Sequence, residues 1–147
     1  ADWDAVIDVD LKSVFFLSQA VARQMVSRAA RGKIINIASL LSYQGGVRVA
    51  AYTAAKSGLA GLTRLLACEW APRGINVNAI APGYFETNNT EALRADSALD
   101  AAILARIPAG HWGKPEEIGG AAVFLASPAS DYVHGVTLPV DGGWLAR

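Results

Sequence analysis

The chain has 147 residues, of which 52% are hydrophobic and 18% charged, and its 13 Lys plus Arg balance 13 Asp plus Glu. These values are typical of a single globular domain and exclude a disordered chain. The balanced charge does not favour binding to nucleic acid or to an anionic membrane, and no apolar run approaches the roughly 20 residues that span a bilayer. We therefore expect a cytoplasmic protein whose ligand is a small molecule.

Cysteine and histidine are scarce, which limits disulfide and metal chemistry. Cys68 lies within an apolar helical pattern, so we expect it to be buried, and a lone cysteine fits a reducing compartment. His111 and His134 have no metal-ligand spacing with it. We therefore expect no metal site and two ordinary loop histidines.

The first half of the chain alternates between helical and strand patterns. Residues 4–30 carry apolar side chains at helical spacing, and Gly32 is placed to end that helix. Residues 33–39 (KIINIAS) and 75–83 (INVNAIAPG) are apolar, β-branched runs that predict parallel strands buried on both faces. A helix is predicted between them, over 50–71.

The second half continues this alternation. Residues 88–108 are polar at first and then helical, which predicts a mobile flap. Pro115 and two following acidic residues predict a helix through Ala126, and residues 135–143 predict a third strand. Strands alternating with helices predict an α/β fold with βαβ units, a parallel sheet, and ligands at the carboxyl ends of the strands.

Tyr52 and Lys56 are four residues apart, so in a helix their side chains share one face. Such a pair is more often structural, with a tyrosine at a helix edge and a solvated lysine. Here the pair opens a helix just after a predicted strand that ends in Ser39, and the NAIAPG strand and turn follow it. Three segments are therefore expected to meet at one edge of the sheet.

These residue types suit proton transfer. A phenol has a pKa of about 10, so using it as a base near neutral pH requires about 4 kcal/mol of added stabilisation of the phenolate. An ammonium about 4 Å away contributes about that much at an effective dielectric of about 20. Ser39 could hydrogen-bond the same substrate oxygen. The trio Ser39, Tyr52 and Lys56 is therefore predicted to interconvert an alcohol and a carbonyl while a cofactor exchanges hydride.

Ser39 and the segments YTAAK, NVNAIAPGYFET and PEEIGGAAVFLASPASDYVHGVTLPVDGG resemble, in order, the C-terminal part of the short-chain dehydrogenase/reductase family. The resemblance covers essentially the whole chain. It implies the C-terminal half of a Rossmann-like, doubly wound parallel sheet, with three strands and flanking helices. Residues 1–147 would form the C-terminal part of one domain, with the N-terminal dinucleotide-binding half absent.

The resemblance also implies an activity and its site residues. Within the family the chain is most similar to members that oxidise sugar acids of the 2-deoxy- or 2-keto-3-deoxy-gluconate type with NAD, and NADP is not excluded. Tyr52 would be the acid/base, Lys56 its partner and a donor to the nicotinamide ribose, and Ser39 the group that orients the substrate. The cofactor would also contact Pro82, Gly83, Phe85 and Thr87.

Two positions depart from the family pattern, and two arginines are further candidates. Asp10 stands where the family has a catalytic Asn near the lysine, and a carboxylate there would compete with the phenolate for the ammonium. His111 stands where the family usually has Arg. Arg48 and Arg94 are candidate clamps for a substrate carboxylate, although solvated surface arginines are the alternative.

Two functions therefore remain open. The first is an oxidoreductase that assembles as a homo-oligomer, a dimer or a tetramer, as the resemblance implies. The second is a truncated, catalytically inactive fragment that acts at most as an oligomerisation module through the helices over 4–30 and 50–71 and the final strand.

Overall fold

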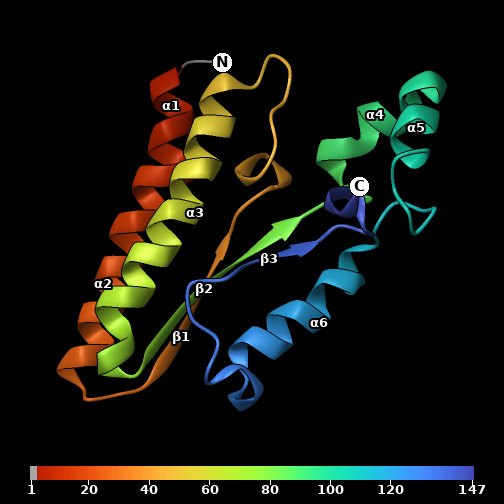
Figure 1. Cartoon of the computed structure of the whole chain (residues 1–147). Helices are drawn as coiled ribbons and strands as arrows, with labels where there is room; N and C mark the ends of the chain where they lie inside the picture. Colours follow the sequence, from red (N-terminus) through yellow and green to blue (C-terminus); the bar gives the residue numbers. More distant parts are fainter. Residues whose placement is uncertain (1–2) are drawn as a thin grey trace.

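A three-stranded parallel sheet lies at the centre of the computed structural model, which describes residues 3–147 (Figure 1). Its strand order is β1 (Gly32–Ile37), β2 (Ile75–Pro82) and β3 (Thr137–Val140). The strands are joined by helical segments, as parallel strands require. The predicted α/β class and parallel sheet are confirmed.

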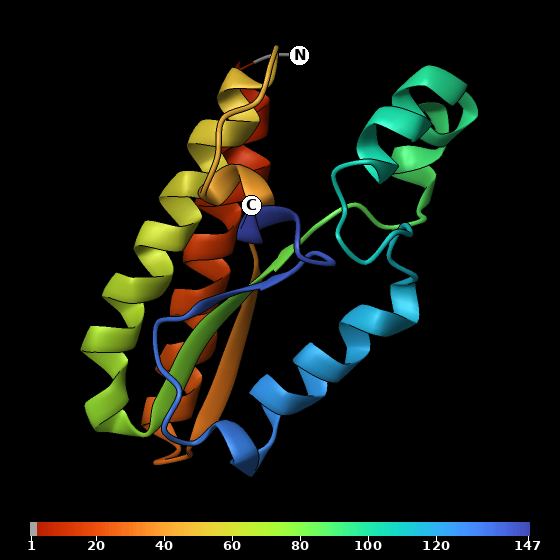
Figure 2. The same ribbon diagram turned by 45° about the vertical axis from the view of Figure 1, so that its right-hand side comes forward.

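Helices cover both faces of this sheet. One face carries a continuous rod made of α1 (Trp3–Ile7), the π-helical turn η1 (Asp8–Lys12) and α2 (Ser13–Ser27), with α3 (Ala50–Trp70) beside it (Figures 1 and 2). The other face carries α6 (Pro115–Ala126). This arrangement is the doubly wound architecture that was predicted, and the helices over 50–71 and 115–126 are confirmed.

The first helix ends earlier than its pattern indicated. It stops at Ser27, and the chain turns at Ala29, whose backbone has a left-handed φ of 49°. Gly32 is the first residue of β1, so the prediction that it ends the helix is wrong. The sequence pattern compatible with a helix continues to residue 30, but the backbone already turns toward the sheet at Ala29.

The two strands predicted to be buried on both faces differ in burial. Every residue of β2 except Pro82 is buried. Most of β1 is only half-buried, and its last residue, Ile37, is 53% exposed. The prediction is therefore confirmed for β2 and wrong for β1, because β1 lies at the edge of the sheet among the described residues.

A helical flap lies beyond the carboxyl ends of the strands. It contains η4 (Asn88–Thr90), α4 (Glu91–Ala95) and α5 (Ser97–Leu104), so its helical part is confirmed and its mobility stays a prediction. The Trp112 indole donates a 2.6 Å hydrogen bond to Asp100 of α5. This contact ties the flap to the segment that leads into α6.

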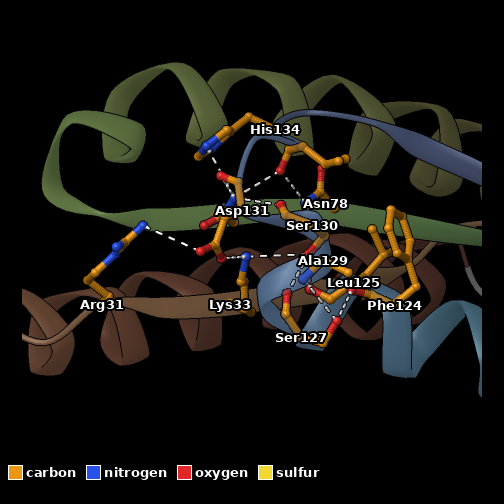
Figure 3. Close-up of polar contacts among 12 residues, drawn as sticks. Arg31, Lys33, Asn78, Phe124, Leu125, Ser127, Ala129, Ser130, Asp131 and His134 are labelled. Carbon is orange, nitrogen blue, oxygen red and sulfur yellow. Dashed lines mark hydrogen bonds and ion pairs between the residues drawn. The ribbon is translucent and has the colours of Figure 1, made fainter.

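A polar cluster joins the opposite end of the sheet to the loop before β3 (Figure 3). Lys33 Nζ on β1 donates to Asp131 Oδ1 at 2.7 Å, and this hydrogen bond holds the pKa of the Asp131 carboxyl below its usual value. Asn76 of β2 is buried and donates from one amide nitrogen to the carbonyls of Ser130, Asp131 and Val133. The loop is thereby fixed to both strands.

Cys68 is exposed, so the prediction of a buried cysteine is wrong. It follows the buried pair Leu66 and Ala67 in α3, and the next step of the helix turns its side chain away from the sheet. His111 and His134 both lie in loops, as expected. Along the described residues, no helix is both long and apolar enough to cross a membrane.

Candidate active site

The predicted trio meets at the carboxyl end of the sheet. Tyr52 and Lys56 lie one turn apart in the first half of α3, and Lys56 Nζ is 5.4 Å from the centre of the Tyr52 ring. Ser39 follows β1 as the N-cap residue of the short helix η2 (Leu40–Ser42). The Ser39 hydroxyl accepts a 3.2 Å hydrogen bond from the Leu41 amide, which limits the rotation of its side chain.

Lys56 is buried rather than solvated, since only 7% of the residue is exposed. Its ammonium donates to the carbonyl of Ile37 at 3.0 Å and forms an ion pair with Asp10 Oδ1, also at 3.0 Å. The hydroxyl of Ser42 donates to the Lys56 carbonyl at 2.7 Å. Two partners therefore hold the ammonium and a third holds the backbone of Lys56, which the alternative of a solvated side chain does not explain.

A cavity of about 370 Å³ opens beside the trio. Six of the predicted site residues line it: Ser39, Tyr52, Pro82, Gly83, Phe85 and Thr87. Gly83 allows β2 to pass close to the loop after β3, because a Cβ at this position would lie 2.6 Å from the Cα of Asp141. The prediction that these segments share one edge of the sheet is confirmed.

The cavity has further walls beyond these six residues, and two of them, Asn89 and Thr90, belong to the predicted flap over 88–108. These walls come from Ile37 and Ala38 at the end of β1, Asn89 and Thr90 of η4, and Pro115 and Ile118 of α6. The α6 residues are about sixty positions away from Tyr52 in the sequence, so only the folded chain brings them to the site. They belong to the segment beginning PEEIGG, which resembles the family, but the spacing of this segment alone does not place it at the cavity.

The two candidate arginines lie outside this lining. Arg48 is exposed in the loop before α3, where its backbone has a left-handed φ of 62°. Arg94 of α4 donates through Nη2 to the carbonyl of Thr87 at 3.2 Å. Arg94 is therefore next to a cavity residue, whereas no described contact links Arg48 to the cavity.

The cavity suits the nicotinamide end of a dinucleotide. Its apolar walls (Ile37, Pro82, Phe85, Pro115 and Ile118) can pack on a flat ring, and the hydroxyls of Ser39, Tyr52, Thr87 and Thr90 can bond polar substituents. Lys56 adds a buried cation next to Tyr52. The residues present therefore fit the cofactor that the sequence predicted.

A family described as enoyl-(acyl carrier protein) reductase matches residues 1–145. The chain is 64% identical to the 2-dehydro-3-deoxy-D-gluconate 5-dehydrogenase of Dickeya dadantii and 63% identical to that of Escherichia coli. It belongs to the short-chain dehydrogenase/reductase family. Each match covers 99% of this chain and 58% of the relative, so the chain spans little more than half the length of these curated relatives.

Solved structures of this family show the same architecture. A candidate 2-deoxy-D-gluconate 3-dehydrogenase from Agrobacterium tumefaciens, with bound NADP, aligns with a TM-score of 0.98 at 68% identity, covering 99% of this chain and 59% of that one. The gluconate 5-dehydrogenase of Burkholderia cenocepacia, in complex with NADP and tartrate, aligns with a TM-score of 0.96 at 47% identity, covering 99% and 57%. The predicted family and Rossmann-like fold are thus confirmed.

Proposed function

We propose that this chain carries the proton-transfer part of an oxidoreductase that interconverts a secondary alcohol and a ketone on a sugar acid. The observation that carries the proposal is the position of Tyr52 and Ser39 on one cavity, with the ammonium of Lys56 buried behind them. The activities named for the close relatives support a gluconate-type or deoxygluconate-type substrate.

The roles of the three residues follow from their chemistry. The Tyr52 hydroxyl gives its proton to the carbonyl oxygen in the reduction, and the Tyr52 phenolate takes the proton of the alcohol in the oxidation. Lys56 stabilises the phenolate form of Tyr52. Because Lys56 is buried, its positive charge interacts with the phenolate more strongly than it would in water. Ser39 binds the same substrate oxygen and fixes its direction.

We propose a nicotinamide cofactor that lies against Pro82, Gly83 and Phe85, with Thr87 at its polar substituents and Lys56 at its ribose. When bound, this cofactor would supply or accept the hydride. Three solved relatives carry NADP, which favours NADP over the NAD that the sequence predicted.

For the substrate carboxylate we propose Arg94 rather than Arg48. Arg94 lies on the flap next to Thr87, and its Nε is buried without a hydrogen-bond partner among the described residues. A guanidinium with an unused donor can bind a carboxylate through paired hydrogen bonds once the flap adjusts.

The alternative, an inactive oligomerisation module, is favoured by a different observation. A groove of about 450 Å³ lies between α2 and α3, and its lining includes Phe15, Leu65 and Trp70. Arg23 and Glu69 also line it, so two copies related by a two-fold axis could exchange ion pairs. This surface also fits a homo-oligomeric enzyme, so the assay below must separate the two functions.

The test measures NADPH formation from gluconate and 2-deoxygluconate by the protein at its natural length, after its intact mass has been determined. Tyr52→Phe should reduce turnover by about 10²- to 10⁴-fold while cofactor binding persists, because only the ionisable oxygen is lost. Tyr132→Phe is the matched control, since Tyr132 is fully exposed and should not matter. Substantial turnover by Tyr52→Phe would contradict the assignment, and no turnover of any sugar acid by the parent protein would favour the oligomerisation module.

A further inference from the structure

The most enclosed ion pair among residues 3–147 lies directly behind the proposed site. Asp10 Oδ1 is 3.0 Å from Lys56 Nζ, and the two side chains are 28% and 9% exposed. In each of the other described ion pairs at least one side chain is nearly half exposed or more. The mechanism above uses Lys56 and leaves Asp10 without a role.

The backbone around Asp10 is unusual as well. Asp10 is the central residue of the π-helical turn η1, within which the amide of Ser13 bonds to the carbonyl of Asp8, five residues back. The Ser13 hydroxyl also donates to the carbonyl of Val9. A π turn is wider than an α turn and often marks a functional site. Here it lies where the first helical rod runs beside α3 (Figure 1), so that Asp10 meets Lys56.

The other charged groups nearby have partners of their own. Lys12 and Asp8 pair with each other at 3.0 Å on the exposed side of the same turn. Lys33, which lines a groove together with Lys56, directs its ammonium to Asp131 and Ser130. Asp10 is therefore the acidic group that the structure pairs with Lys56.

This pairing changes what ionisation of Tyr52 does to the local charge. With Asp10 in place, Asp10, Lys56 and neutral Tyr52 sum to zero, and loss of the phenol proton leaves a net negative cluster. With a neutral residue at position 10, the same ionisation converts a net positive cluster into a neutral one. The second change is more favourable in a partly buried site. Asp10 therefore opposes formation of the phenolate that Lys56 promotes.

We propose that Asp10 is a positioning residue that acts on Tyr52 through Lys56. Together with the Ile37 carbonyl it holds the ammonium in place, and its negative charge disfavours the phenolate form of Tyr52. The site is thereby better suited to give a proton to a substrate carbonyl than to take one from an alcohol. This consequence for turnover rests on the proposed function, whereas the effect on Tyr52 itself does not.

The test titrates the Tyr52 phenol in the 147-residue chain by the ultraviolet absorbance of phenolate, with the signal of the matching Tyr52→Phe protein subtracted. Asp10→Asn keeps a hydrogen-bond acceptor of the same size and removes the charge. We expect its titration midpoint about half a unit to one unit lower in pH than that of the parent. Asp8→Asn removes the same charge from the same turn and should leave the midpoint unchanged. Asp10→Ser offers a second neutral residue should Asp10→Asn fail to fold.

An unchanged midpoint in the neutral variants, or a midpoint that rises, would overturn the proposal. An equal shift in Asp8→Asn would overturn it as well, because the effect would then be unspecific. In the protein at its natural length, the oxidation rate is expected to rise with pH. The midpoint of this rise in the neutral variants should shift by the same number of pH units as the midpoint of the phenol titration. If that protein shows no turnover, the proposed function fails while the phenol titration still decides the role of Asp10.

Discussion

Replacing Asn76 with alanine should destabilise the chain by about 3 kcal/mol. One amide nitrogen lies 3.0 to 3.2 Å from the carbonyls of Ser130, Asp131 and Val133. An amide has two hydrogens, so about two hydrogen bonds are lost, and each contributes about 1 kcal/mol. The missing side-chain atoms leave a small cavity that adds roughly 1 kcal/mol.

Urea unfolding of the chain measures this loss from the transition midpoint and slope. The matched control is Asn88→Ala, which makes the same chemical change at an exposed position of η4 and should stay within about 0.5 kcal/mol of the parent. Equal midpoints for the two variants would refute the reasoning that this amide fastens the loop before β3 to the sheet.

Two further predictions concern pH and assembly. The hydrogen bond from Lys33 lowers the pKa of Asp131 in the folded chain, so the pair contributes stability above the unfolded value near 3.8 and loses it as pH falls further. Lys33→Met should therefore be less stable than the parent at neutral pH, and unfolding curves of the two should converge below about pH 4; a constant gap would contradict this. Leu65→Glu places a charge in the groove between α2 and α3 and should lower the mass of the natural-length protein in light scattering, whereas Val123→Glu on exposed α6 should not. Identical masses would count against this groove as the interface.

The alternation of helices and strands could be predicted from the sequence because helices and buried strands have different patterns of apolar residues. Residues 75–83 show this best: their continuous apolar run predicted a strand buried on both faces, and β2 is buried in this way. The similar run of β1 misled the prediction, because burial at a sheet edge depends on neighbours that local sequence does not specify. Cys68 misled it as well, because one step along a helix separates a buried face from an exposed one.

The positions of the site residues could be predicted where a sequence motif indicated them. The spacing of Tyr52 and Lys56 placed both side chains on one face of α3, and the strand ends placed Ser39 and Gly83 beside them. The contribution of Ile118 could not be foreseen, since it depends on how α6 packs across the sheet. The proximity of Asp10 to Lys56 was predicted through the family resemblance, and the structure confirms it with an ion pair of 3.0 Å, although the residue spacing alone does not specify how the first helical rod packs against α3.

The exposed edge of β1 is connected physically to the chemistry of the site. Ile37 lines the cavity of the proposed site and also a second groove of about 430 Å³, which Lys56 shares and which runs along β1 and α2. Within this second groove the ammonium of Lys56 is held by Asp10 and by the carbonyl of Ile37, the residue that lines both cavities. Any polypeptide that covers this groove would exclude water from the ion pair and strengthen each charge interaction within it. The competition between Asp10 and the Tyr52 phenolate for the charge of Lys56 therefore depends on what packs against the edge of β1. We expect the midpoint of the phenol titration to change when a polypeptide covers this edge, as well as when Asp10 is substituted.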